Sequence, residues 1–402
     1  MRRAHCLTIW TAFVLLAFPA LALGQATRFD VKVPSNTPAD QTLYIAGGVA
    51  QLGNWRPDGL KLTRQEDGLY VVEVDLPAGE AVEFKITRGT WETVEKAADG
   101  TEIANRSVKP GETAKVEVAA WADIPAPAAG AGPAPVQEAV GPTVTGELRL
   151  HENFQSRELG NKRTLRVWLP PGYDEDEQKR YPVLYMQDGQ NLFDRVTAFL
   201  NNEWQADETA TKLIEEGRIR PLIIVGVDHA GDQRMVEYSP KIGEGGAVSR
   251  GDAYLRFLAT EVKPFIDDTY RTEDGRAHTF IGGSSMGGLI ALEGLRTQAR
   301  TFGGAIVMSP SLHWNGARLQ EVMENAAMPV WKDVRLFLSI GEAEGARAAE
   351  EVARVRSLNE KLRQSLSPVN LQLVVVRDGQ HNEQAWGALL PEALTLLLGS
   401  GS

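Results

Sequence analysis

Ser285 is the residue of this sequence whose surroundings most clearly suggest chemistry. It lies in Gly283-Ser284-Ser285-Met286-Gly287, which has the spacing G-x-S-x-G, between a strand-like run, HTFIGG, and a helix-like run, LIALEGLR. A nucleophile elbow needs this context, because the chain turns sharply and glycines leave room for the turn. The pattern predicts Ser285 as a nucleophile, with the Met286 amide facing a developing oxyanion. A glycine-rich turn without chemistry is the alternative.

A serine hydroxyl needs a base to take its proton and a carboxylate to orient that base. In α/β-hydrolases the acid and then the histidine follow the serine, which favours His381 in RDGQHNEQAW; His313 precedes every suitable acid. Glu342 and Glu344 both follow the predicted strand VRLFLSIG. The pattern alone leaves both open, and we favour Glu344 because it lies further into the loop.

A second oxyanion donor is expected in the loop after the predicted strand YPVLYMQ, which reads Asp188-Gly189-Gln190-Asn191. Gly189 lets the backbone turn, so the amide of Gln190 is the predicted donor, although a simple turn is the other interpretation. Such a Ser-His-Glu site works through an acyl-enzyme and needs no metal or organic cofactor.

The elements around these residues predict an α/β fold with a mostly parallel sheet covered on both faces. From residue 147 to 400, apolar strands alternate with amphipathic helices. The expected strands are RTLRVWLP, YPVLYMQ, PLIIVGVD, HTFIGG, GAIVMSP, VRLFLSIG and LQLVVVRDG, and the expected helices include 253–268, 289–296 and 347–366. Pro264 should end or kink the first of these helices.

A different pattern precedes this domain. Residues 27–121 give short alternating runs separated by turn residues, which is typical of a small antiparallel β-sandwich. Residues 122–146 are rich in Ala, Pro and Gly and predict a semi-rigid linker.

Residues 1–24 have a basic start, an apolar run and small residues, so we expect a cleaved secretory signal and a periplasmic or extracellular location. A retained membrane anchor is the alternative, but the apolar run is shorter than a bilayer span, and no later run is long enough either. Cys6 is the one cysteine, so the mature chain would carry no thiol. The net charge of −11 argues against a nucleic-acid partner.

The segments YPVLYMQDGQNLFD, GVDHAGDQRMVEYSP, IGGSSMGGLIAL, SIGEAEG and DGQHNEQAW together resemble the Putative esterase family of α/β-hydrolases over residues 148–398. That family includes feruloyl, acetylxylan and enterochelin-type esterases, esterase D and mycolyltransferases. The resemblance implies serine chemistry, with the acid at the Glu of a Gly-x-x-Glu segment, here Glu344, and an oxyanion donor after Asp-Gly, here Gln190. It also suggests that Arg234, Glu237 and Tyr238 line the substrate pocket, unless an internal Arg–Glu pair braces this loop.

The first domain resembles starch-binding modules through LGNW, VEFKITRGTWETVE and EIANR. The resemblance implies a glycan platform at Trp55 and Lys85, and therefore an α-glucan as a candidate partner. The position of a second platform tryptophan reads Val94-Glu95-Lys96, so we expect Trp91 from the same loop to replace it. A structural or partner-docking sandwich is the alternative.

These observations predict a secreted serine esterase that acts on a small-molecule or glycan ester, such as an acyl or feruloyl group on carbohydrate, or on a siderophore ester. Two alternatives stay open: an acyltransferase with the same triad, and a non-catalytic carbohydrate-binding protein. Trp314 and Trp386 are expected to pack near the core, with a role as apolar walls of the site as the other interpretation.

Overall fold

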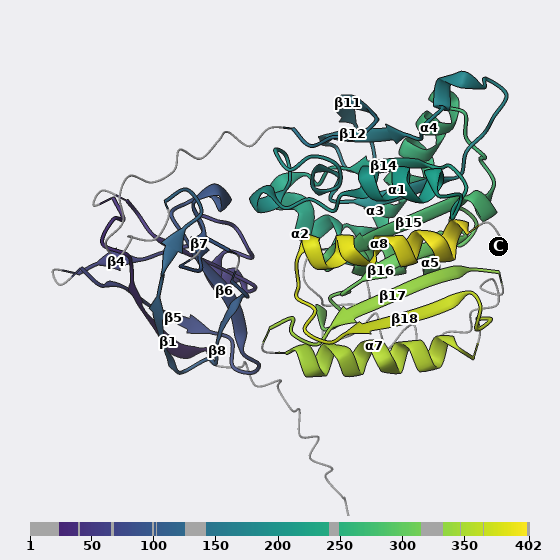
Figure 1. Cartoon of the computed structure of the whole chain (residues 1–402). Coiled ribbons are helices and arrows are strands. Elements are labelled where there is room, and N and C mark those ends of the chain that lie inside the picture. The colour runs from purple at the N-terminus through teal and green to yellow at the C-terminus, as the bar shows by residue number, and fades with distance from the viewer. Residues whose placement is uncertain are drawn as a thin grey trace, which may run out of the picture.

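The computed structural model of the chain describes residues 24–38, 41–65, 68–98, 100–101, 103–124, 142–240, 249–314, 333–345, 347–364 and 366–399. The expected secretory signal, apart from residue 24, and most of the expected linker lie outside the described residues. The described residues form a β-sandwich and a larger domain that is built on an eight-stranded sheet (Figure 1).

The β-sandwich packs two four-stranded sheets around a small apolar core. One sheet has the order β4-β5-β1-β9 and the other β3-β2-β6-β8, while β7 and β10 form a separate pair. The strands are β1 (Gln25–Lys32), β2 (Tyr44–Gly47), β3 (Leu60–Lys61), β4 (Thr63–Arg64), β5 (Tyr70–Leu76), β6 (Val82–Thr87), β7 (Glu95–Lys96), β8 (Arg106–Val108), β9 (Thr113–Glu117) and β10 (Ala120–Trp121). Strands β1 and β9 pair in parallel, which departs at this edge from the antiparallel pairing expected of the sandwich.

The second domain contains a mostly parallel sheet of order β11-β12-β14-β13-β15-β16-β17-β18. Its strands are β11 (Glu147–Gln155), β12 (Lys162–Leu169), β13 (Val183–Gln187), β14 (Ile223–Val227), β15 (Thr279–Ser284), β16 (Gly304–Met308), β17 (Arg335–Gly341) and β18 (Leu371–Val376). The pairs β11–β12 and β12–β14 are antiparallel, and the other neighbouring pairs of this sheet are parallel. The predicted fold class is confirmed, but the edge strand β11 was not anticipated, because no residue of this strand is fully buried.

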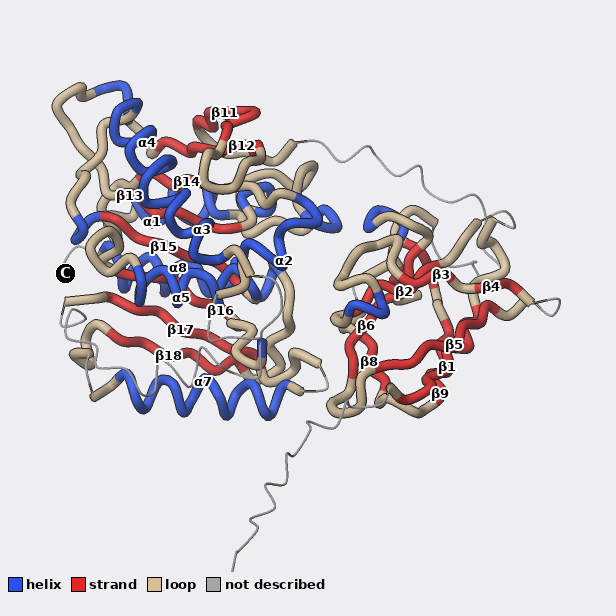
Figure 2. Tube along the Cα trace, turned by 180° about the vertical axis from the view of Figure 1, so that it is seen from behind, coloured by secondary structure: helices blue, strands red, loops and turns tan. Residues whose placement is uncertain are grey.

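Helices cover both faces of this sheet (Figures 1 and 2). Helices α1 (Ala206–Glu215) and α8 (Glu383–Leu398) bury their apolar side chains on one face. On the other face lie α3 (Gly251–Phe257), α4 (Lys263–Thr269), α5 (Met286–Thr297) and α7 (Ala348–Leu362). The short helix α2 (Arg234–Glu237) precedes α3. Among the helices of the described residues, none is long and apolar enough to cross a membrane.

Pro264 does not end the helical run in which it occurs. A π-helical turn, Leu258–Val262, joins α3 to α4, and Pro264 lies in the first turn of α4. Proline fits the first turn of a helix, and a π turn changes the hydrogen-bonding pattern ahead of it. The helical path therefore continues to Thr269 instead of stopping near Pro264.

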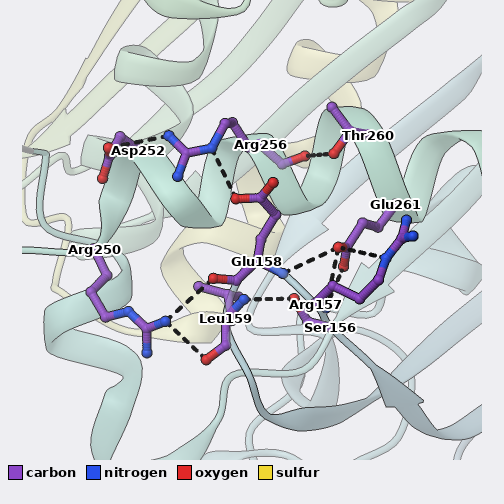
Figure 3. Close-up of polar contacts among 9 residues, drawn as sticks. All are labelled: Ser156, Arg157, Glu158, Leu159, Arg250, Asp252, Arg256, Thr260 and Glu261. Atoms are coloured by element: carbon purple, nitrogen blue, oxygen red, sulfur yellow. Dashed lines mark hydrogen bonds and ion pairs between the residues drawn. The ribbon is translucent and has the colours of Figure 1, made fainter.

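The loop between β11 and β12 is fastened to this helical run (Figure 3). The Glu261 carboxylate, in the π turn, accepts hydrogen bonds at 3.1 Å from the backbone amides of Arg157 and Glu158. The Arg250 guanidinium donates to the Leu159 carbonyl at 2.9 Å. These contacts fix the antiparallel edge of the sheet to the helices that support its centre.

Candidate active site

Six loops at the carboxyl edge of the parallel sheet meet around one cavity of about 820 Å³. They follow β13, β14, β15, β16, β17 and β18, and the lining residues that they supply are Gln190, Arg234, Ser285, Ser309, Glu344 and His381. In open parallel sheets ligands bind at this edge, because the loops and helix N-termini converge there. The candidate residues that are far apart in the sequence are thereby brought together.

Ser285 occupies a strained turn between β15 and α5. Its backbone angles, φ 55° and ψ −122°, are rare for a residue with a side chain. The turn is close-packed, since a Cβ on Gly283 would lie 2.8 Å from the carbonyl carbon of Gly287, and one on Gly288 would lie 2.9 Å from the Met308 oxygen. The Ser285 hydroxyl lies 3.3 Å from the hydroxyl of Ser311.

Glu344, rather than Glu342, lies beside His381. Its Oε2 is 2.9 Å from Nδ1 of the imidazole, and its side chain is only 6% exposed. Glu342 is 47% exposed and lies 3.9 Å from Arg356. The Glu344 carboxylate also accepts hydrogen bonds from the Gly341 amide at 2.6 Å and from the Ser309 hydroxyl at 2.5 Å. Glu344 is therefore held in position to orient the imidazole.

Ser309 and Trp386 form a support for the carboxylate that sequence reasoning missed. The Trp386 indole N–H donates to Ser309 Oγ at 2.9 Å, and the Ser309 hydroxyl donates in turn to Glu344. The Trp386 ring also packs edge-on against His381, with 4.9 Å between ring centroids. The only available signal was that Ser309 follows β16 at the same sheet edge as Ser285. Trp386 is thus both buried and part of the cavity wall, and Trp314 also lines the cavity.

Acidic neighbours control the protonation of His381. Burial lowers its pKa, but the hydrogen bond and charge of Glu344, together with the charges of Glu83 and Glu383, outweigh burial and raise the pKa above its usual value. Among the described residues, Nε2 of this imidazole has no hydrogen-bond partner. The ring can therefore present Nε2 to the cavity while Nδ1 is held by Glu344.

Two backbone amides at the cavity, those of Gln190 and Met286, have no acceptor of their own among the described residues. Met286 is the first residue of α5, where the amides have no intrahelical partner. Gly189 permits the loop to pack against β14, because a Cβ there would lie 2.5 Å from the carbonyl carbon of Gly226.

Arg234 lines the cavity, but its side chain is committed to Asp188. Its guanidinium makes two hydrogen bonds to that carboxylate, at 2.7 and 2.8 Å. Burial raises the pKa of Asp188, but the Arg234 charge outweighs it and the pKa is lowered. Arg234 therefore braces the loop that carries Gln190.

Glu237 and Tyr238 do not line the cavity, contrary to the expectation that they contact the substrate. Glu237 pairs with Arg163 at 2.9 Å, with both side chains fully buried, and Tyr238 is buried with its hydroxyl accepting from the Asp188 amide at 3.2 Å. The sequence suggested an Arg–Glu brace between neighbours, whereas Arg234 and Glu237 each pair with a partner that is distant in the chain.

Glu383 is a further cavity residue that the sequence did not reveal. Burial raises the pKa of its carboxyl to about 7, with Asp188 adding to the effect. Its Oε1 accepts a hydrogen bond from the Asn191 side chain at 3.1 Å. Within the described residues, no group of three or more His, Cys, Asp or Glu side chains is placed to hold a metal ion.

The residues proposed for glycan binding, Trp55, Lys85 and Trp91, line this same cavity from the β-sandwich. The two tryptophans are half-buried. The Lys85 ammonium is buried and donates to the Ile103 carbonyl at 2.5 Å. Lys96, at the position of the missing platform tryptophan, is buried. Its neighbour Glu95 is fully buried and accepts from Arg106 at 2.8 Å.

Residues 156–397 match the family described as Putative esterase, and residues 25–119 match the starch binding domain. The chain belongs to the Putative esterase family. It is accordingly a carboxylic ester hydrolase of the α/β-hydrolase type, with an N-terminal β domain of the starch-binding type.

Several proteins are similar to one or the other part of this chain. The Ferri-bacillibactin esterase BesA of Bacillus subtilis (strain 168) is 25% identical over 223 residues, which are 50% of this chain and 73% of that protein. An alpha-amylase of Niallia circulans is 42% identical over 103 residues, 25% of this chain but only 8% of that protein. The structure of the siderophore hydrolase EstA from Aspergillus nidulans is 20% identical with a TM-score of 0.50, covering 67% of this chain and 98% of EstA.

Proposed function

We propose that this member of the family is a secreted serine esterase in which Ser285, His381 and Glu344 are the catalytic triad. The observation that carries the proposal is the 2.9 Å contact between Glu344 and Nδ1 of His381, in a cavity that the strained Ser285 turn also lines. Glu344 holds the imidazole in the tautomer that leaves Nε2 free to accept a proton.

In the proposed reaction, Ser285 Oγ attacks the ester carbonyl carbon while His381 Nε2 accepts the hydroxyl proton. The oxyanion that forms is stabilised by the amides of Gln190 and Met286. The carbonyl then reforms, the ester C–O bond breaks, and His381 returns the proton to the leaving alcohol. Water adds to the acyl-enzyme by the same route, which releases the acid and restores Ser285.

Labelling with a fluorophosphonate probe tests the nucleophile, and the adjacent serine provides a matched control. We expect intact mass to show one adduct on the wild-type protein and on Ser284→Ala, and none on Ser285→Ala. Turnover of 4-nitrophenyl acetate by Ser285→Ala should fall by about 10⁴-fold or more, because the attacking oxygen is gone. An unlabelled wild-type protein, or a labelled Ser285→Ala variant, would contradict the proposal.

Export is a separate part of the proposal, supported by the composition of residues 1–24. Expression of the full chain in a bacterial host should give a mature protein that begins near residue 25 and is found outside the cytoplasm. N-terminal sequencing after cell fractionation would measure this. A cytoplasmic protein that keeps its first 24 residues would refute export and leave the triad assignment unaffected.

A further inference from the structure

We propose that the β-sandwich forms one wall of the active site and that the substrate is an uncharged carbohydrate ester. Its sugar part lies against Trp55 and Trp91, while its ester carbonyl reaches Ser285. The inference rests on the serine esterase function proposed above. It makes the sandwich a determinant of ester specificity instead of a separate anchoring module.

The first support is that both domains line the same cavity. The sandwich contributes side chains that include Trp55, Glu83, Lys85, Trp91 and Asn105. The sheet domain contributes the proposed triad and the two oxyanion donors. A ligand that reaches Ser285 through this space therefore passes the same surface that the starch-binding type of domain offers to a glycan.

The second support is the contact between the domains at the edge of this cavity. Trp91 packs edge-on against Phe199, with ring centroids 5.6 Å apart, and Glu80 lies 3.4 Å from Arg347. A Cβ on Gly345, next to the proposed triad acid, would lie 3.3 Å from Glu83 Oε1. The sandwich lies beside α2 and the loops at the end of the large sheet (Figures 1 and 2).

The third support is the chemistry of the sandwich wall. Trp55 adopts a left-handed conformation with φ 65°, and its indole packs over Gly48, where a Cβ would lie 3.3 Å from the indole nitrogen. Sugar rings expose apolar C–H faces that stack on such indoles, while their hydroxyl groups need polar partners. The Asn105 amide and the Glu83 carboxylate supply polar groups on the same wall, 3.4 Å apart.

The charge of the cavity favours an uncharged ligand. Among the described residues, six acidic side chains line it, Glu80, Glu83, Asp188, Glu344, Glu351 and Glu383, against four cationic ones, Arg56, Lys85, Arg234 and Arg347. The four cations already have partners: Asp58, the Ile103 carbonyl, Asp188 and Glu80. A strongly anionic ligand, such as a ferric catecholate ester, would meet an excess of acidic side chains, and each cationic side chain in the described lining already has a partner.

Kinetics of the full chain with two kinds of ester test this inference. We expect Trp55→Ala and Trp91→Ala to lower kcat/KM for O-acetylated malto- and xylo-oligosaccharides by about tenfold each, mainly through KM, because each removes one stacking surface. Hydrolysis of 4-nitrophenyl acetate, which has no sugar, should fall clearly less in each variant than hydrolysis of the oligosaccharide esters. Trp91→Phe should restore part of the loss.

Tyr44→Ala is the matched control, since Tyr44 is a half-buried aromatic residue on strand β2 of the sandwich that does not line the cavity. This variant should leave kcat/KM unchanged for both kinds of ester. Equal losses on both kinds of ester, unchanged kinetics on the oligosaccharide esters, or a preference for ferric catecholate esters that the tryptophan variants leave intact would each overturn the inference.

Inhibition by a sugar without an ester gives an independent readout. Maltoheptaose or xylohexaose should inhibit hydrolysis of 4-nitrophenyl acetate competitively in the wild type and about tenfold more weakly in Trp91→Ala. Absence of inhibition by both sugars in an enzyme that turns over the nitrophenyl ester would refute the shared site alone. Absence of turnover and of fluorophosphonate labelling would instead refute the serine esterase function beneath it.

Discussion

The two walls of the cavity are built in different ways. On the sheet-domain wall, polar groups are held by short contacts: Glu344 alone accepts from Gly341, Ser309 and His381, at distances between 2.5 and 2.9 Å. On the sandwich wall, the prominent side chains are two half-buried indoles, Trp55 and Trp91.

This difference separates two physical demands. Proton transfer and oxyanion stabilisation require donors and acceptors that are fixed within tenths of an ångström before the substrate arrives. Stacking against a sugar depends on contact area and tolerates small shifts. We therefore expect changes in the sheet-domain wall to act mainly on kcat, and changes in the sandwich wall to act mainly on KM.

Of the changes that test this difference between the walls, substitution of the proposed triad acid should have the largest effect on kcat. Glu344→Gln keeps the shape of the side chain but removes the charge that orients the His381 tautomer, so we expect kcat for 4-nitrophenyl acetate to fall by about 10³- to 10⁴-fold. Glu342→Gln is the control two residues away, and it should stay within about twofold because its side chain is 47% exposed. A larger loss for Glu342→Gln would transfer the role of acid to that residue.

A smaller effect is expected from the hydroxyl that supports the acid. Ser309→Ala removes the donor to Glu344 and leaves the Trp386 indole without its acceptor, so kcat should fall by about ten- to a hundredfold with little change in KM. Ser309→Thr keeps the hydroxyl and should recover much of the rate. A loss that appears in KM, or one that Ser309→Thr does not rescue, would show that Ser309 only packs.

The sequence predicted the parts of the fold that repeat a pattern. The buried parallel strands produce apolar runs, and the Ser285 turn has glycines at the positions where a side chain would clash with the backbone. Both features could therefore be predicted from the sequence. The edge strand β11 was not predicted because none of its residues is fully buried, so it gives no apolar run. The helix expected over 253–268 is present, but its continuation past Pro264 could not be predicted, because a π turn precedes the proline and no local signal marks such a turn.

Long-range pairing was harder to predict than the proposed catalytic order. Arg234 and Glu237 are three residues apart and suggested one ion pair with each other. In the fold, Arg234 pairs with Asp188 after β13, and Glu237 pairs with Arg163 on β12. Ser309 carries no motif at all, since its role depends on two neighbours that lie 35 and 77 positions away in the chain. The shared cavity between the domains is likewise a property of packing that neither domain's sequence encodes alone.

The smallest predicted effect is that of a sandwich-wall residue, Glu83, on the pKa of His381 in the sheet-domain wall. Glu83 belongs to the sandwich, yet its charge helps to raise the pKa of His381. Catalysis needs the neutral imidazole, so activity falls as the pH drops through this raised pKa. Glu83→Gln removes a negative charge that favours the imidazolium, which should lower the pKa and move the acid limb of the kcat/KM profile to lower pH.

Glu80→Gln provides the matched control on the same domain. Glu80 is 66% exposed, and water and salt screen such a charge, so this variant should leave the acid limb in place. Profiles for 4-nitrophenyl acetate measured at constant ionic strength would distinguish the two variants. If neither moves the acid limb, the sandwich contributes only contact surface, and the electrostatics of the triad belong to the sheet domain alone. A shift confined to Glu83→Gln would mean that the sandwich wall also influences the pKa of His381, and with it the pH dependence of catalysis.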